Sequence, residues 1–225
     1  MFDLISDNLY IREHKIKCLG ETLVLNGQRA LFRPATKTLL ISDLHLGKEE
    51  VFNRAGLPLP SGVSQQNLQR LDGLINLYSP REIIVLGDLM HAAPTSQDIW
   101  PEEISDWLNK HSTITIRVVV GNHDRAIERL DSRIEWTANP LSAPPFIYTH
   151  EPVTFASKYI ISGHLHPTYV LVTHTDRIRC PVFWFKKNNA ILPAFGSFTG
   201  GYNIKPNKND KVYMVNDDDV IALNF

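Results

Sequence analysis

The chain has 225 residues, of which 43% are hydrophobic, so it is long enough to bury a core, and its length favours one domain. Its 23 lysines and arginines are balanced by 24 aspartates and glutamates. This balance excludes the strongly basic surface of a general nucleic-acid coat protein and restricts any nucleic-acid contact to a local patch. Two widely separated cysteines, Cys18 and Cys180, argue against a disulfide framework or a thiolate zinc site. Charged residues interrupt the N-terminal segment, so we expect a cytoplasmic protein with no membrane contact.

Apolar segments of strand length recur along the first part of the chain. Residues 22–25 and 29–32 flank the dipeptide Asn26-Gly27, which favours a tight turn, and together they predict a hairpin. Short apolar runs then have the length of buried strands. These runs cover residues 39–41, 83–86, 118–120, 146–148 and 159–161.

Two helices are predicted between these strands. Apolar side chains recur at helical spacing over residues 68–78, and a second amphipathic segment covers residues 101–111, where Pro101 suits the first turn. Strands and helices therefore alternate in the first half. Beyond residue 159, further strands are expected without helical periodicity between them, at residues 170–173, 182–185, 211–215 and 220–223. The second half is predicted to be a β-rich layer of an α/β fold.

Residues of the kinds that bind metals follow each of the five short apolar runs. They are Asp43 and His45, then Asp88, then Asn122 with His123, then His150, and finally His164 with His166. Sites in open α/β sheets form outside the carboxyl ends of the strands, so these side chains should converge. Extended backbone also places both members of a pair such as His164 and His166 on one face. Glycines beside several of these residues allow a sharp turn close to a cation.

The ligand types indicate the class of metal. Oxygen and imidazole donors without a thiolate favour manganese, with iron or zinc as alternatives, over copper(I) or an iron–sulfur cluster. The set exceeds one tetrahedral site and fits two divalent ions, roughly 3.5 to 4 Å apart, that share Asp88 as a bridge. Such a cluster keeps a positive charge that attracts the oxygens of a phosphate ester. The expected ligands are Asp43, His45, Asp88, Asn122, His150, His164 and His166.

These motifs occur in an order that resembles the calcineurin-like metallophosphoesterase superfamily. The resemblance covers residues 39–167 and rests on Asp43-Leu44-His45, Gly87-Asp88, Gly121-Asn122-His123-Asp124, His150 and Gly163-His164-Leu165-His166. Longer strings are similar to the bacterial ligase-associated DNA-damage-response phosphoesterases. They are SDLHLGK at residues 42–48, LGDLMH at 86–91, His150-Glu151-Pro152, and LPAFGSFTGG at 192–201.

The resemblance implies a fold and a division of the ligands. The fold is a four-layer sandwich of two mixed β-sheets flanked by helices. It forms a single domain over residues 1–225, with residues 1–33 as an N-terminal hairpin region packed on it. One metal would be held with Asp88 by Asp43, His45 and His166. The second would be completed by Asn122, His150 and His164.

The resemblance also implies roles for residues that do not bind metal. His123 would stabilise or protonate the leaving oxygen, and Asp124 would orient its ring. Lys48 and Arg125 adjoin ligand motifs and could contact the phosphate, although charged residues after strand ends are usually solvated. His91 could approach the site or be structural. A loop at residues 196–201 is expected near the mouth of the site.

Three functions are compatible with this pattern. The first is a dinuclear phosphodiesterase or nuclease associated with DNA repair, with single-stranded DNA or nucleotides as substrate and repair helicases or ligases as partners. The second is a small-molecule phosphatase or nucleotide phosphodiesterase, because substrate choice depends on loops that the motifs do not fix. The third is a non-catalytic scaffold, which a complete ligand set argues against. The aromatic residues at 183–185 could form a stacking platform, but their alternation favours core positions.

Overall fold

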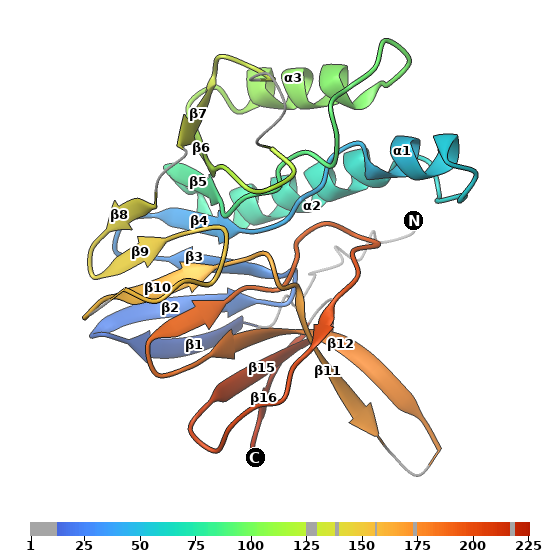
Figure 1. Ribbon diagram of the computed structural model, residues 1–225. Helices are drawn as coiled ribbons and strands as arrows, with labels where there is room; N and C mark the ends of the chain where they lie inside the picture. Colours follow the sequence, from blue (N-terminus) through green and yellow to red (C-terminus); the bar gives the residue numbers. More distant parts are fainter. Residues whose placement is uncertain (1–12, 125–129, 138–139, 156, 173–174, 217–218) are drawn as a thin grey trace, which may run out of the picture.

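The computed structural model describes residues 13–124, 130–137, 140–155, 157–172, 175–216 and 219–225. These residues form two β-sheets that stack face to face, and three helices cover the outer face of the first sheet (Figure 1). The two mixed sheets of the expected sandwich are thereby confirmed. Within the described part of the chain, every helix lies on this one side of the sandwich, and none is long and apolar enough to span a membrane. Neither Cys18 nor Cys180 forms a disulfide bond in the part of the chain that the structure describes.

The first sheet contains seven strands in sequence order. They are β1 (Glu13–Cys18), β2 (Glu21–Asn26), β3 (Ala30–Arg33), β4 (Thr38–Ile41), β5 (Glu82–Val85), β6 (Thr115–Val119) and β7 (Ile134–Thr137). Strands β1 to β4 pair antiparallel, whereas β4 to β7 pair parallel. Parallel neighbours need long crossovers. Helices α1 (Lys48–Arg54) and α2 (Val63–Tyr78) lie in the crossover from β4 to β5, and α3 (Trp100–Lys110) lies in the crossover from β5 to β6. The carboxyl ends of β4, β5 and β6 therefore lie together at one edge.

The second sheet has a parallel centre formed by β9 (Phe146–Tyr148), β10 (Tyr159–Ser162) and β13 (Asn189–Ile191). Antiparallel pairing adds β8 (Leu141–Ala143) on one side and β12 (Arg177–Phe185) on the other. Strand β12 also pairs with β11 (Pro167–Val172) and β15 (Lys211–Asn216). Two short strands complete the sheet, β14 (Tyr202–Asn203) beside β11 and β16 (Asp219–Leu223) beside β15.

The apolar pattern of the strands matches the layers. In β4, Leu39 and Ile41 face the helices, whereas Leu40 faces the second sheet, and all three are fully buried. A central strand covered on both faces needs such an uninterrupted apolar run. A third apolar cluster around Val182 and Trp184 packs on the outer face of the second sheet. Burial of each large apolar side chain contributes about 1.5 to 3 kcal/mol, so these clusters hold the layers together.

A buried arginine links the two sheets at the end away from the expected site. Arg33, at the end of β3, is 5% exposed and forms an ion pair with Glu21. Its guanidinium also donates to the carbonyl oxygens of Ala143, the last residue of β8, at 3.2 Å and of Pro144, in the turn that follows, at 2.6 Å. Because Arg33 pairs with Thr38 at the start of β4, this link lies opposite the carboxyl end of that strand.

Most elements predicted from the sequence are present. The hairpin at Asn26-Gly27 is confirmed as β2 and β3, and the five short runs are confirmed as β4, β5, β6, β9 and β10. Both predicted helices and the four later strands are also confirmed. Helix α1 and strands β1, β7, β8, β13 and β14 were not predicted. Strands β1 to β3 extend the first sheet by antiparallel pairing.

Candidate metal centre

The residues that follow the five strands converge between the two sheets. The first sheet contributes Asp43, His45, Asp88, Asn122 and His123, and the second contributes His150, His164 and His166. Six of these side chains form two groups, and within each group the ligand atoms lie within 4.8 Å of one another. We call them the Asp43 group (Asp43, His45 and His166) and the Asp88 group (Asp88, His150 and His164). Asn122 adjoins the Asp88 group, with its Oδ1 atom 3.0 Å from His150 Nε2.

The backbone turns sharply where the ligands are attached. Positive φ angles, uncommon for residues other than glycine, occur at Asp43 (53°), His45 (51°), Asp88 (50°), His164 (68°) and His166 (45°). Backbone hydrogen bonds hold the loops in place, from Asp43 N to Gly87 O at 3.0 Å and from His45 N to Asp88 O at 2.9 Å. Strained backbone of this kind persists only where the surrounding structure determines it, and it is concentrated at functional sites.

Two glycines allow the loops to approach the ligand side chains. A Cβ atom on Gly87 would lie 2.1 Å from Nδ1 of His150, and one on Gly121 would lie 2.2 Å from Oδ1 of Asp88. Gly87 also has a φ angle of 84°, which side chains disfavour. The glycines beside the ligand motifs are therefore required by close packing against the ligands themselves.

Backbone carbonyl groups fix the orientation of the histidine rings. Nδ1 of His150 donates to Leu86 O at 2.8 Å, and Nδ1 of His166 donates to Gly200 O at 3.2 Å. With the proton on Nδ1, the Nε2 atom of each ring presents its lone pair to the centre of the site. Metal-binding histidines are commonly oriented by such a contact on the other ring nitrogen.

The donor atoms fit divalent cations. His150 Nε2 lies 3.0 Å from Asn122 Oδ1 and 3.5 Å from Asp88 Oδ2. With the proton of His150 on Nδ1, all three of these atoms are hydrogen-bond acceptors, so they cannot bond to one another. His166 Nε2 similarly lies 3.2 Å from Asp43 Oδ1. Asp43 and Asp88 are 0% and 2% exposed, and no lysine or arginine of the described residues forms an ion pair with either. Buried carboxylates are costly without a compensating charge, which a cation between these atoms would provide.

The pKa of His45 agrees with this use, whereas the pKa values of Asp88 and His166 are shifted towards the protonated forms, from which a bound cation would displace the proton. Burial, reinforced by the charges of His166 and Lys48, lowers the pKa of His45 to about 2, so its ring is neutral as a metal ligand must be. Burial also raises the pKa of Asp88. The pKa of His166 is raised, because its contact with the Asp43 carboxylate outweighs the opposing effect of burial.

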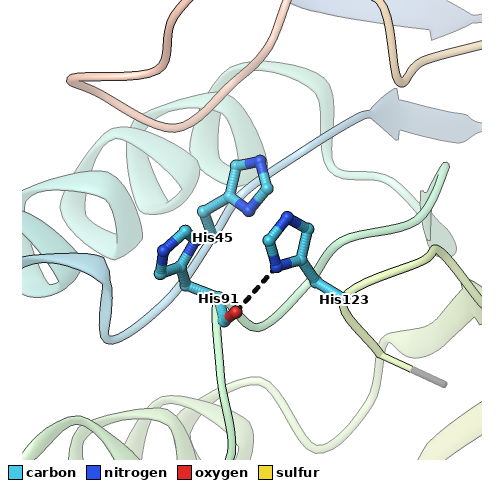
Figure 2. A group of neighbouring side chains, drawn as sticks. All are labelled: His45, His91 and His123. Carbon is cyan, nitrogen blue, oxygen red and sulfur yellow. Dashed lines mark hydrogen bonds between the residues drawn. The ribbon is translucent and has the colours of Figure 1, made fainter. Parts of the chain in front are cut away.

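His123 and His91 lie beside His45 of the Asp43 group, and one ring nitrogen from each of these three histidines lies within 4.8 Å of the others (Figure 2). The rings of His91 and His123 stack with centroids 4.9 Å apart, and Nδ1 of His123 donates to the backbone oxygen of His91 at 2.8 Å. Burial, followed by the charges of Lys48 and His123, lowers the pKa of His91 to about 4. His91, which the sequence left open, therefore belongs to the site and contributes its backbone as well as its ring.

The structure corrects the expectation for Asp124. Its carboxylate accepts hydrogen bonds from the backbone amides of Met90 at 3.2 Å and Gly121 at 3.0 Å, instead of contacting the ring of His123. The group that orients the ring is the carbonyl of His91. Asp124 is 4% exposed and joins the loops after β5 and β6. Its hydrogen bonds tie these two loops together, and neither of them involves the ring of His123.

Of the two basic residues expected near the phosphate, Lys48 and Arg125, the structure describes only Lys48. Lys48 begins α1, is 9% exposed, and places its ammonium group 5.5 Å from the ring centroid of Phe52. Burial lowers its pKa, and its charge in turn affects His45 and His91. Lys48 therefore lies beside the site. Arg125 lies outside the described residues.

The loop at residues 196–201 contacts the site directly. Gly196 N donates to Asp43 O at 3.0 Å, and a Cβ atom on Gly196 would lie 2.4 Å from Leu44 O. Gly200 supplies the carbonyl that binds His166. The expected position of the loop is confirmed. In contrast, the aromatic residues at 183–185 are core residues, with exposed fractions of 7% or less.

The acceptors that orient the rings were missed by reasoning from the sequence. They are the backbone oxygens of Leu86, His91 and Gly200. Every residue has such an oxygen, so no residue type marks these positions. The only available signal was their proximity to ligand motifs within the strings LGDLMH and LPAFGSFTGG.

Comparison with known proteins identifies the family. Residues 36–192 match the family model described as calcineurin-like phosphoesterase. The chain belongs to the calcineurin-like phosphoesterase family. It is a metal-dependent phosphoesterase, and its family uses a dinuclear metal centre.

Solved structures add two similarities to this phosphoesterase. The crystal structure of Pseudomonas putida nuclease MPE is similar, with 30% sequence identity and a TM-score of 0.83, covering 94% of this chain and 100% of that one. YfcE, a phosphoesterase from E. coli, has 14% identity and a TM-score of 0.43, covering 82% of this chain and 96% of that one. No curated protein matches the chain.

Proposed function

We propose that this phosphoesterase is a nuclease that hydrolyses phosphodiester bonds in DNA with two manganese ions, and that it acts in DNA repair in the cytoplasm. The observation that carries the proposal is its similarity to the P. putida nuclease at 30% identity over 94% of the chain. The strings shared with the ligase-associated DNA-damage-response phosphoesterases support the place in repair. The absence of thiolate from the donor set supports manganese.

The two groups of side chains support a division of the ligands. We assign the Asp43 group to one ion and the Asp88 group with Asn122 to the other, and Asp88 would be the carboxylate that both ions share. When bound, the cations would polarise a phosphoryl oxygen and offset its negative charge. The protein's part is to present neutral imidazoles and buried carboxylates in fixed orientations. Leu86 and Gly200 do this by holding the Nδ1 protons of His150 and His166.

We assign the protonation of the leaving oxygen to His123. Its Nδ1–H is held by His91 O, so its Nε2 atom is left to face the ester. The carbonyl acceptor on Nδ1 fixes the direction of the ring, so that a proton carried on Nε2 could pass to the departing alkoxide. Lys48 is assigned to the phosphate oxygens because it begins α1 directly after the loop of His45, where its backbone N donates to His45 O at 3.3 Å.

The test compares four substrates with the same enzyme preparation supplemented with manganese. They are a phosphate monoester, a small diester, a cyclic nucleotide and single-stranded DNA. We expect turnover of the diester and of DNA, loss of turnover with a chelator, and recovery with manganese at least as complete as with magnesium. Turnover of the monoester alone would instead identify a phosphatase. No turnover of any substrate would identify a non-catalytic scaffold.

A further inference from the structure

A cavity of about 280 Å³ opens beside the Asp43 group. His166 forms part of one wall together with the loop from Phe198 to Gly201. Arg29 and Arg179 line the cavity as well. Its size is close to the lower end of the range for small-ligand sites, about 300 Å³, so it could hold one small unit of a chain and not a duplex.

The two arginines reach the cavity from different sheets. Arg29 lies in the turn between β2 and β3, and Arg179 lies on β12 of the second sheet. Arg179 is exposed and forms no ion pair with any residue in the described part of the chain. No aspartate or glutamate of the described residues lines the cavity. Arg179 therefore gives the cavity an uncompensated positive charge on a protein whose net charge is −1, which suits a phosphate group.

The cavity and the metal centre share one side chain, the ring of His166. Nε2 of His166 faces Asp43 at 3.2 Å, and Nδ1 of the same ring is bound to Gly200 O in the cavity wall. A phosphodiester held at the Asp43 group would therefore have its neighbouring nucleotide at the cavity. A small diester would bind at the metal centre but would be too short to contact Arg29 and Arg179.

An exposed aromatic ring lies at the same place. Phe198 lines the cavity and is 53% exposed, although aromatic side chains are usually covered. Its φ angle of 55° is uncommon for a residue with a large side chain, so the loop holds it in a costly conformation. An exposed ring beside a basic groove is the arrangement that binds the bases of single strands by stacking.

We propose that this cavity is a subsite for the nucleotide next to the scissile bond of a single strand. Arg29 and Arg179 bind its phosphate, and Phe198 stacks on its base. The substrate is single-stranded for two reasons. A base that is paired and stacked within a duplex has no free face for Phe198, and a duplex is too large for the cavity. This inference rests on the proposed function and names the form of nucleic acid that the same site takes.

The test measures Arg179→Gln and Phe198→Ala against Lys187→Gln. Lys187 is also exposed, but it follows the other end of β12 and does not line this cavity, so its replacement controls for the loss of one charge. Binding of a fluorescein-labelled oligothymidylate is followed by anisotropy in a chelator, where no cleavage occurs. We expect each cavity variant to bind about tenfold more weakly. Arg179→Gln should also lower the salt slope by about 0.7, the value for one phosphate contact on a single strand.

Activity provides a second readout that separates this inference from the proposed function. In manganese, the ratio of kcat/KM for oligothymidylate to that for bis(p-nitrophenyl) phosphate should fall about tenfold in the cavity variants and stay constant in Lys187→Gln. Equal behaviour of Arg179→Gln and Lys187→Gln would overturn the subsite while leaving the nuclease intact. Equal losses on both substrates, or equal binding of a duplex of the same length, would also overturn it. A wild-type enzyme that cleaves no diester would overturn the proposed function itself.

Discussion

The Asp88 group and the Asp43 group are held in different ways. In the Asp88 group, His150 is 4% exposed, its ring packs against Gly87, and its Nδ1 binds a carbonyl at the end of β5. In the Asp43 group, the side chain of His166 is 19% exposed, and its Nδ1 binds a carbonyl in the loop at residues 196–201. Each group has two buried members and one partly exposed histidine, His164 or His166, but only His166 of the Asp43 group lies in the wall of the cavity.

This difference separates two tasks within one site. A ring fixed by core packing keeps its orientation whatever binds nearby, so the Asp88 group provides the stable reference for the site. A ring held by a surface loop can respond to a neighbouring ligand at little cost. Substrate selection is therefore expected on the side of the Asp43 group, where loop residues form the wall.

Asp88→Asn should have the largest effect, because in our assignment this carboxylate serves both groups. An amide cannot replace the charge that offsets two cations, so we expect loss of most bound metal and a fall in kcat/KM of about 10³-fold. Elemental analysis of the purified variant checks the metal content. Two ions per chain at wild-type affinity would rule out the bridging role.

His123→Ala should lower kcat by about 10²- to 10⁴-fold while both ions remain bound. The defect should shrink for a substrate with a nitrophenolate leaving group, because little proton transfer is then needed. Kinetics with good and poor leaving groups, together with metal analysis, check this. A defect of equal size on both substrates would contradict the general-acid role, and loss of a metal would make His123 a ligand.

Gly87→Ala and Gly200→Ala test the comparison directly. A Cβ atom on Gly87 would lie 2.1 Å from His150, whereas one on Gly200 would meet nothing within 4 Å. We expect Gly87→Ala to lower the free energy of unfolding by about 1 to 3 kcal/mol and to weaken the ion of the Asp88 group. Gly200→Ala should change stability by less than about 0.5 kcal/mol. Thermal unfolding and metal titration of both variants measure this, and equal effects would show that the two groups are held equally firmly.

Asp124→Asn should have the smallest effect on the reaction. The amide retains one acceptor oxygen but presents N–H groups to the second backbone donor, leaving a buried amide of Met90 or Gly121 without a partner. We expect a loss of about 1 to 3 kcal/mol in stability and a fall in kcat of less than about tenfold. Denaturant unfolding and steady-state kinetics check both values. A kcat defect as large as that of His123→Ala would return Asp124 to a catalytic role.

The convergence of the site could be predicted because strand direction determines it. Asp43 and Asp88 follow neighbouring parallel strands, so the pattern of apolar runs already places them at one edge. The contact between Asp124 and His123 was predicted wrongly because sequence adjacency does not fix the direction of a side chain. The cavity was beyond prediction for a related reason. Arg29 and Arg179 meet only because the turn of one sheet stacks against a strand of the other.

The fold shows the same limits in particular elements. Residues 39–41 read clearly as a strand because both faces are buried. Helix α1 was missed because it has only 7 residues and buries Lys48 and Glu49, so it has no apolar periodicity. Strands such as β8, with 3 residues, are defined by their partner and not by their own composition. The covering of only one sheet by helices depends on chain crossovers that hydrophobic patterns do not reveal.

The proposed ligands come from both sheets, and this affects how the protein unfolds. Arg33 ties the sheets together at one end, and at the other end each sheet supplies only part of a coordination set. Cations that need both parts bind the folded chain and not the unfolded one. By mass action, each ion then adds RT ln(1 + [M]/Kd) to the apparent stability, about 2.7 kcal/mol at a free concentration of one hundred times Kd. We therefore expect the unfolding midpoint of this enzyme to depend on the free metal concentration, and we expect chelation to weaken the contact between its sheets as well as to stop its chemistry.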